Sequence, residues 1–182
     1  MEYRINFRPF KLSDAQFINQ LRNEESMEAL IGGGKRPVSY EREVKWVEDV
    51  IMKDNPQSIY FAITLVGSDE IIGYTSISEI DFRNGTCFWS GIKLDKLKSG
   101  KGIGMEVALK ILKYVFEELR MERCKAECLE THEVALKMMQ KAGYKTEGLM
   151  RSNIYKNGIH NNQWLLSIIR PEYEEIKMKY TL

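Results

Sequence analysis

Three strand-like segments separated only by turn signals constrain the fold of this chain more than any other feature. They are SIYFAITLV (58–66), EIIGYTSISEIDF (70–82) and TCFWSGIKL (86–94). Gly-Ser-Asp separates the first two, and Arg-Asn-Gly, a strong hairpin signal, separates the last two. Strands joined by such short turns pair antiparallel. The sequence therefore predicts an antiparallel meander that ends at Leu94.

Helical patterns precede this meander. After a first strand at residues 3–7, apolar residues recur at helical spacing behind Ser13-Asp14, and Ser39 is a typical N-cap for a second helix. The stretch IGGGKRP (31–37) between the two helices predicts a loop, which is either a binding lid or a plain linker.

The second half of the chain alternates helices and strands. An apolar stripe over 107–119 predicts a long helix, and CKAECLE (124–130) predicts a strand, so that residues 87–130 form a parallel crossover. A short helix at 133–141, strands at 144–150 and 162–169, and a charged helix from Pro171 follow. The prediction is an α/β (α+β) fold with a mostly antiparallel sheet, in a single domain over residues 1–182.

The composition excludes several classes of protein. A net charge of +1 argues against a dedicated nucleic-acid binder, and no apolar run is long enough to span a membrane. The three cysteines and two histidines are not spaced as zinc ligands, so no metal is expected. The first residues lack the apolar core of a signal peptide, which predicts a cytoplasmic location.

The segment KSGKGIGMEVALK (98–110) places three glycines at alternate positions directly before the long helix: Gly100, Gly102 and Gly104. Neither a Walker loop nor a dinucleotide fingerprint fits their spacing. Small residues let the backbone N–H groups of 99–104 approach an anion, and the helix N-terminus adds its positive dipole end. Four lysines lie nearby and suit a pyrophosphate: Lys93, Lys96, Lys98 and Lys101. The alternative is a tight strand-to-helix turn beside solvated lysines.

This loop resembles a family motif. SGKGIG (99–104) is similar to the Q/R-x-x-G-x-G/A motif of the GNAT superfamily of acyl-CoA-dependent N-acetyltransferases, from which it departs at Ser99. FRPFKLSDAQFINQLRNEESM (7–27) resembles the first strand and helix of that family, and DEIIGYTSISEID (69–81) resembles its central hairpin. HEVALKMMQKAGYKTEGLMRSNIYKNG (132–158) resembles the stretch NxxAxxLYxxxGFxxEGxxR. The layout is similar to the branches that acetylate ribosomal-protein N-termini, polyamines and amino sugars.

The resemblance implies a fold and a co-substrate site. The sheet would be V-shaped and splayed at its middle, and the pantetheine arm of acetyl-CoA would lie between the strands that end near Leu94 and Glu130. Main-chain groups at Ile92 and Leu94 would hold the pantetheine amides and polarise the thioester carbonyl. The phosphates would lie on the loop residues Ser99, Gly100, Lys101, Gly102, Ile103 and Gly104.

The activity that the resemblance implies is acetyl transfer from acetyl-CoA to a primary amine by direct attack. The acceptor would be a small molecule such as a polyamine or an amino sugar, or a protein N-terminus. The implied partners include neither nucleic acid nor membrane. Dimers are common in the family, which makes a homodimer an expected assembly.

The chain departs from the family pattern at two positions. His132 replaces an asparagine that contacts the CoA arm, and its imidazole still offers a hydrogen-bond donor. Met139 replaces a tyrosine that often protonates the departing thiolate, which methionine cannot do. Because a thiol has a pKa of roughly 8.5, water or another residue could protonate the thiolate. Met139 also leaves open a second interpretation, a non-catalytic acyl-CoA-binding or sensing module.

Residues for the acceptor side follow from position in the predicted elements. Glu79 is the candidate general base, acting through water, because strand alternation places it on one face with Ile77 and Asp81; the same face could equally be solvent. Arg22 and Asn23 would line the acceptor pocket or simply end the first helix.

Two aromatic residues complete the set of candidates. Tyr155 would point into the acceptor cleft or pack on the sheet. Trp89 would pack or shape the pocket, since an indole cannot serve as a base.

Overall fold

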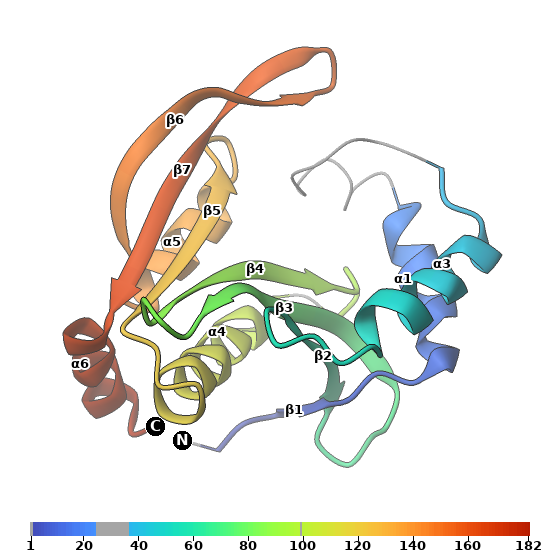
Figure 1. Cartoon of the computed structure of the whole chain (residues 1–182), viewed down its shortest axis with the longest axis horizontal. Coiled ribbons are helices and arrows are strands. Elements are labelled where there is room, and N and C mark those ends of the chain that lie inside the picture. Colours follow the sequence, from blue (N-terminus) through green and yellow to red (C-terminus); the bar gives the residue numbers. More distant parts are fainter. Residues whose placement is uncertain (1, 25–36, 99) are drawn as a thin grey trace.

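A seven-stranded sheet organises the computed structural model, which describes residues 2–24, 37–98 and 100–182 (Figure 1). Its strands, within these residues, are β1 (Ile5–Arg8), β2 (Ile59–Leu65), β3 (Ile71–Asp81), β4 (Thr86–Leu94), β5 (Arg123–Leu129), β6 (Lys145–Lys156) and β7 (Ile159–Ile169). The strand order is β1-β2-β3-β4-β5-β7-β6, and every neighbouring pair is antiparallel except β4 and β5. The predicted mixed α/β fold with a mostly antiparallel sheet is therefore confirmed.

The helices follow the predicted order. They are α1 (Ala15–Arg22), after a 3-10 turn at Leu12–Asp14; α3 (Tyr40–Trp46), continued by a π-helical turn at Val47–Ile51; α4 (Ile103–Lys113), continued by a π-helical turn at Tyr114–Glu118; α5 (Glu133–Lys141); and α6 (Arg170–Tyr180). None of the helices within the described residues is long and apolar enough to cross a membrane.

Among the local details of the prediction, one helix cap is confirmed and one hairpin differs in length. The Ser39 hydroxyl accepts a hydrogen bond from the Arg42 N–H at 3.3 Å, as an N-cap does. The last two strands are longer than predicted, because Asn157-Gly158, both with positive φ, closes them into one hairpin. The predicted loop at 31–37 lies outside the described residues up to position 36.

Two hydrophobic clusters cover opposite faces of the sheet. The larger one packs α4, α5 and α6 against the strands, with Leu109 and Leu112 of α4 fully buried. The smaller one packs α1 and the turn after α3 against β2 and β3, around Ile18 and Tyr74. Helices on both faces hold the middle of the sheet between two apolar layers.

The sheet parts at its only parallel seam in the described chain. Four residue pairs join β4 to β5, from Thr86 with Arg123 to Trp89 with Ala126. Beyond them β4 stays paired with β3 up to Leu94, whereas β5 stays paired with β7 up to Leu129. Figure 1 shows the two strands diverging after the seam. The predicted central splay is confirmed, and it lies just past Trp89.

Candidate active site

A bulge in β4 marks the point where the strands part. The register between β3 and β4 shifts between Thr75 and Ile77, and Gly91 adopts a φ of +76°, which favours glycine. The Thr75 hydroxyl donates to the Gly91 carbonyl at 2.7 Å and accepts from the buried Trp89 indole N–H at 2.8 Å. Thr75 thus fixes the bulge. Sequence reasoning missed this role, although a glycine inside a strand is the usual signal of a bulge.

Past the bulge, residues 90–94 form an edge of β4 with strand pairing on one side only, within the described chain. Ile92 pairs with Thr75 and Leu94 pairs with Gly73, both on β3. Main-chain N–H and C=O groups on the β5 side of this edge are available to a ligand. The structure therefore places Ile92 and Leu94 on an open strand edge, where an extended polar chain can form main-chain hydrogen bonds.

The glycine loop lies directly beyond this edge and opens α4. Gly100 and Gly102 both have a φ of +84°, and Lys101 between them has a φ of +49°. Gly104 lies close to α5, because a Cβ there would lie 3.1 Å from the Met138 sulfur, which would have to shift by a few tenths of an ångström. Ser99 lies outside the described residues, and Ile103 is the first residue of α4. Glycine therefore suits the backbone shape of the loop, and at position 104 it allows two helices to pack closely.

Two backbone N–H groups in the first turn of α4 lack an acceptor within the described part of the chain. Ile103 donates its N–H to the Gly100 carbonyl at 3.1 Å, whereas the N–H groups of Gly104 and Met105 have no acceptor among the described residues. Backbone donors at a helix N-terminus, together with the helix dipole, favour the binding of an anion such as a pyrophosphate.

His132 lies at the start of α5, the helix that follows β5 along the chain, and Met139 lies within that helix. His132 is the N-cap residue, and burial lowers the pKa of its half-buried imidazole, which keeps the ring neutral at pH 7. Met139 is only 3% exposed and belongs to the larger hydrophobic cluster. Tyr144 does not replace the tyrosine that is absent at position 139 as a proton donor. Its hydroxyl is buried and donates to the Cys124 sulfur at 3.2 Å.

Glu79 lies at a second bulge, and this corrects one prediction. The register shifts between Ser78 and Asp81, and Glu79 has a φ of +51°. Ile77 is fully buried, whereas the Glu79 side chain is 62% exposed, so simple alternation does not place the two on one face. The Glu79 carboxylate accepts a hydrogen bond from Lys125 Nζ at 2.9 Å.

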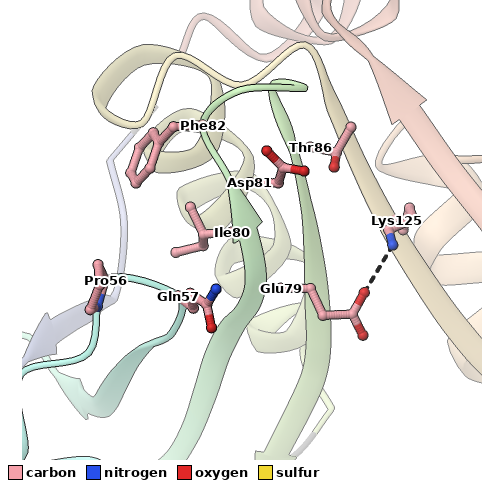
Figure 2. A pocket seen from close by; sticks show the side chains of 8 residues that line it. All are labelled: Pro56, Gln57, Glu79, Ile80, Asp81, Phe82, Thr86 and Lys125. Carbon is pink, nitrogen blue, oxygen red and sulfur yellow. Dashed lines mark hydrogen bonds and ion pairs between the residues drawn. The ribbon is translucent and has the colours of Figure 1, made fainter.

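Glu79 and Lys125 meet at the rim of an open cavity of about 600 Å³, shown in Figure 2. The cavity is lined by Pro56, Gln57, Glu79, Ile80, Asp81, Phe82, Thr86 and Lys125. Asp81 is engaged elsewhere, because its carboxylate accepts the N–H groups of Arg83 and Asn84 and closes the hairpin turn. Of the cavity's two carboxylates, Glu79 is the one directed toward β5.

Glu127 is a functional candidate that sequence reasoning missed. It follows Ala126, the last β5 residue paired with β4, so it stands where the seam ends. Burial and the nearby Glu79 charge raise the pKa of its carboxyl group above the ordinary value. Charged residues alternate with buried Cys124 and Ala126 in CKAECLE, and that pattern was the available signal. A carboxylate of raised pKa at this point can take a proton from an ammonium group.

The predicted acceptor residues of α1 behave differently from each other. Arg22 forms a two-pronged ion pair with the fully buried Glu43, with Nη2–Oε1 and Nε–Oε2 both at 3.0 Å, and its guanidinium lies 4.8 Å from the centre of the Trp46 ring. Asn23 instead ends α1, because its side-chain amide donates to the Asn19 and Val38 carbonyls.

Lys93 lies on the face of the sheet that α1 and α3 cover. Its ammonium group is 4.9 Å from the centre of the Tyr74 ring. Burial, and secondarily the charge of Arg22, lowers the pKa of Lys93 to about 8.

Tyr155 lies far from the seam. Its ring is 61% exposed and contacts His160 across the β6–β7 hairpin, 5.1 Å between ring centres. His160 is six residues along β7 from Leu166, the partner of Ala126 at the end of the seam. At ~3.3 Å per residue this separation is about 20 Å. The structure thus gathers the residues near Ile92, the glycine loop and Glu79 around the parting strands, but not Tyr155.

Within the described residues, no group of three histidine, cysteine, aspartate or glutamate side chains could hold a metal ion. The three cysteines are free and buried.

Comparison with known proteins gives a consistent result. A family model described as "Acetyltransferase (GNAT) domain" matches residues 4–145. The probable N-acetyltransferase YjcK of Bacillus subtilis is 29% identical over 122 residues, 67% of each chain. The uncharacterized N-acetyltransferase p20 of Bacillus licheniformis is 24% identical over 175 residues, covering 93% of this chain and 95% of p20. The solved structure of a Vibrio cholerae spermidine N-acetyltransferase with CoA and spermine superposes with a TM-score of 0.84 at 17% identity, covering 94% of this chain and 98% of that one.

Proposed function

The chain belongs to the GNAT family of acetyl-CoA-dependent N-acetyltransferases, and from this premise we propose that it acetylates a primary amine by direct attack of the amine on acetyl-CoA. The observation that supports the proposal is the parting of β4 and β5 directly beside the glycine loop of α4. In this proposal the β4 edge binds the pantetheine arm of acetyl-CoA, and the N-terminus of α4 binds its phosphates.

The proposed binding mode follows the chemistry of that co-substrate, which supplies an activated thioester. The edge at Ile92 and Leu94 would hold the pantetheine amides, and His132 would face the arm from α5. The phosphates would lie on residues 99–104 and the first turn of α4, where Lys101 adds a positive charge.

The proposed chemistry uses groups on either side of the seam. Glu127 or Glu79 would take the proton from the acceptor ammonium, directly or through water, and the β4 edge would donate hydrogen bonds to the developing oxyanion. Met139 supplies no proton to the departing thiolate, so water is the proton source in this proposal.

The acceptor class is proposed from the charges near the seam. Glu79 and Glu127 favour a cationic amine, and the Vibrio cholerae relative is a spermidine N-acetyltransferase. A polyamine is therefore the first acceptor to test, before amino sugars and peptide N-termini. The homodimer and the cytoplasmic location remain predictions.

Isothermal titration with acetyl-CoA tests the binding mode. We expect tight binding by the wild-type protein and its loss in Gly102→Glu, because a glutamate there is strained at a φ of +84° and its charge repels phosphate. Gly67→Glu is the matched control, since Gly67 has a φ of +81° in the β2–β3 turn and open space around it. Absence of wild-type binding would refute the proposed function, whereas equal binding by folded Gly102→Glu would place the phosphates elsewhere.

A second candidate function rests on Met139, which removes the usual proton donor. It is a non-catalytic acyl-CoA-binding or sensing module. Release of CoA thiol during incubation with a panel of amines discriminates the two functions. Binding of acetyl-CoA without thiol release from any amine would favour the module.

A further inference from the structure

Lys101 is the strained residue of the glycine loop. Its φ of +49° lies in the left-handed region, which a side chain with a Cβ disfavours, and it stands between two glycines that tolerate the same region freely. A residue held in this way needs support from the surrounding structure.

Arg4, the residue directly before β1, supplies this support. Its Nη2 donates to the Lys101 carbonyl at 2.7 Å, and its Nε donates to Glu106 Oε1 at 2.6 Å. Glu106 also accepts the Arg4 backbone N–H, at 2.8 Å, on its other carboxylate oxygen. Arg4 therefore ties β1, the loop and α4 together.

The ion pair between Arg4 and Glu106 also affects the charge beside the proposed phosphate site. Glu106 is 4% exposed and lies in the first turn of α4, close to the proposed phosphate site. A buried carboxylate there repels an anion unless a cation compensates it, and the Arg4 guanidinium is in ion-pair contact with it.

We propose that Arg4, held by Glu106, is a positioning residue for the phosphate end of acetyl-CoA. It fixes the carbonyl of Lys101 and so the shape in which the loop presents its N–H groups, and it cancels the charge of Glu106. The inference rests on the proposed binding of the phosphates at this loop. It concerns affinity for the phosphate-bearing part of the ligand and leaves the pantetheine edge of β4 unaffected.

The test compares CoA with pantetheine, which lacks every phosphate. CoA affinity is measured by isothermal titration, and pantetheine affinity by its displacement of CoA. In Arg4→Gln we expect CoA to bind about tenfold more weakly, because hydrogen bonds that involve charged groups are lost, while pantetheine affinity stays within about twofold. Arg4→Lys keeps the positive charge but not the several N–H donors of the guanidinium group. Its CoA affinity should therefore lie between those of the wild type and Arg4→Gln.

Arg8→Gln is the matched control. Arg8 is the last residue of β1, the strand that Arg4 directly precedes, and it also pairs with a buried carboxylate, Asp14, through bonds of 2.8 and 2.9 Å. Its other partners are Asp69 and the Pro9 carbonyl, and none of these residues belongs to the glycine loop. We expect both variants to lose stability in thermal unfolding, so a merely structural role would change CoA and pantetheine affinities in parallel in both.

Three outcomes would overturn the inference or its basis. A folded Arg4→Gln, or Arg4→Lys if the first does not fold, with the wild-type ratio of CoA to pantetheine affinity refutes the positioning role. An equal change of that ratio in Arg8→Gln refutes its specificity. Failure of the wild-type protein to bind CoA refutes the proposed function instead.

Discussion

At the seam, two glutamate side chains differ in how much water surrounds them. Glu79 is exposed and forms an ion pair with Lys125. Glu127 is more buried, and its carboxyl pKa is raised. A base with a pKa closer to neutrality is the more effective one at neutral pH. Glu127 is thus the stronger candidate of the two.

Glu127→Gln is expected to lower kcat by about 10²- to 10⁴-fold, the usual contribution of a general base. Since the base must be ionised, wild-type kcat should rise with pH through the raised carboxyl pKa, and the variant should lose that step. Steady-state kinetics from pH 5 to 9 measures both effects. Glu79→Gln should have the smaller effect, and an unchanged kcat in Glu127→Gln would exclude the role.

Lys93 makes folding depend on pH. Its pKa is about 8 in the folded protein, lower than in the unfolded chain, so the unfolded chain binds more protons between these two values. This group's contribution to stability therefore rises with pH above about 8. Lys93→Met should be more stable than wild type at pH 7, and the difference should shrink toward pH 10. Urea unfolding at several pH values tests this, and a constant difference would contradict it.

The sequence could predict part of this site. The glycine loop before α4 followed from the residues themselves, whereas the place of Ile92 was implied by the family resemblance. The face on which Glu79 lies could not be predicted, because the bulge in β3 adds a residue and so interrupts the alternation of buried and exposed side chains. The sequence did not single out Glu127, because its position at the end of the seam depends on where the pairing between β4 and β5 stops.

Among the elements, β4 is the one whose irregularity the site depends on. Its bulge at Gly91 coincides with the end of pairing to β5, and Thr75 of β3 links the two sides of that bulge. Periodicity predicted the strand itself but not this departure from regular geometry. A tertiary hydrogen bond between Thr75 and Trp89 has no trace in the local pattern of either strand.

Thr75→Val should reduce the free energy of unfolding by about 1–3 kcal/mol, because the buried Trp89 N–H and the Gly91 carbonyl both lose their partner. Thr64→Val is a suitable control, since Thr64 is equally buried and the described residues show no hydrogen bond from its hydroxyl. Urea denaturation compares them. Equal losses in the two variants would show that the bridge contributes nothing specific.

The whole molecule consists of two sheet halves joined by four residue pairs and by the crossover through α4. A ligand between the diverging strands would satisfy backbone groups that belong to both halves. The order of strands and helices made this arrangement predictable, and the family resemblance supplied the splay.

Amide hydrogen exchange with and without acetyl-CoA tests this view of the molecule. We expect slower exchange on binding at residues 90–94, 100–105 and 127–129, because their N–H groups gain acceptors or lose contact with water. The β6–β7 hairpin should exchange unchanged. Protection confined to the hairpin would contradict the proposed location.

The order of strands in the sheet also determines how the protein tolerates being cut short. The last strand in the chain, β7, lies between β5 and β6, and in the described structure it is the strand with which β6 pairs. A chain that ends before Ile159 therefore loses two strands from its sheet, because β6 is left without a neighbour. During synthesis β1 to β4 can pair before β7 has been made, whereas β5 and β6 gain their shared neighbour only once β7 has left the ribosome.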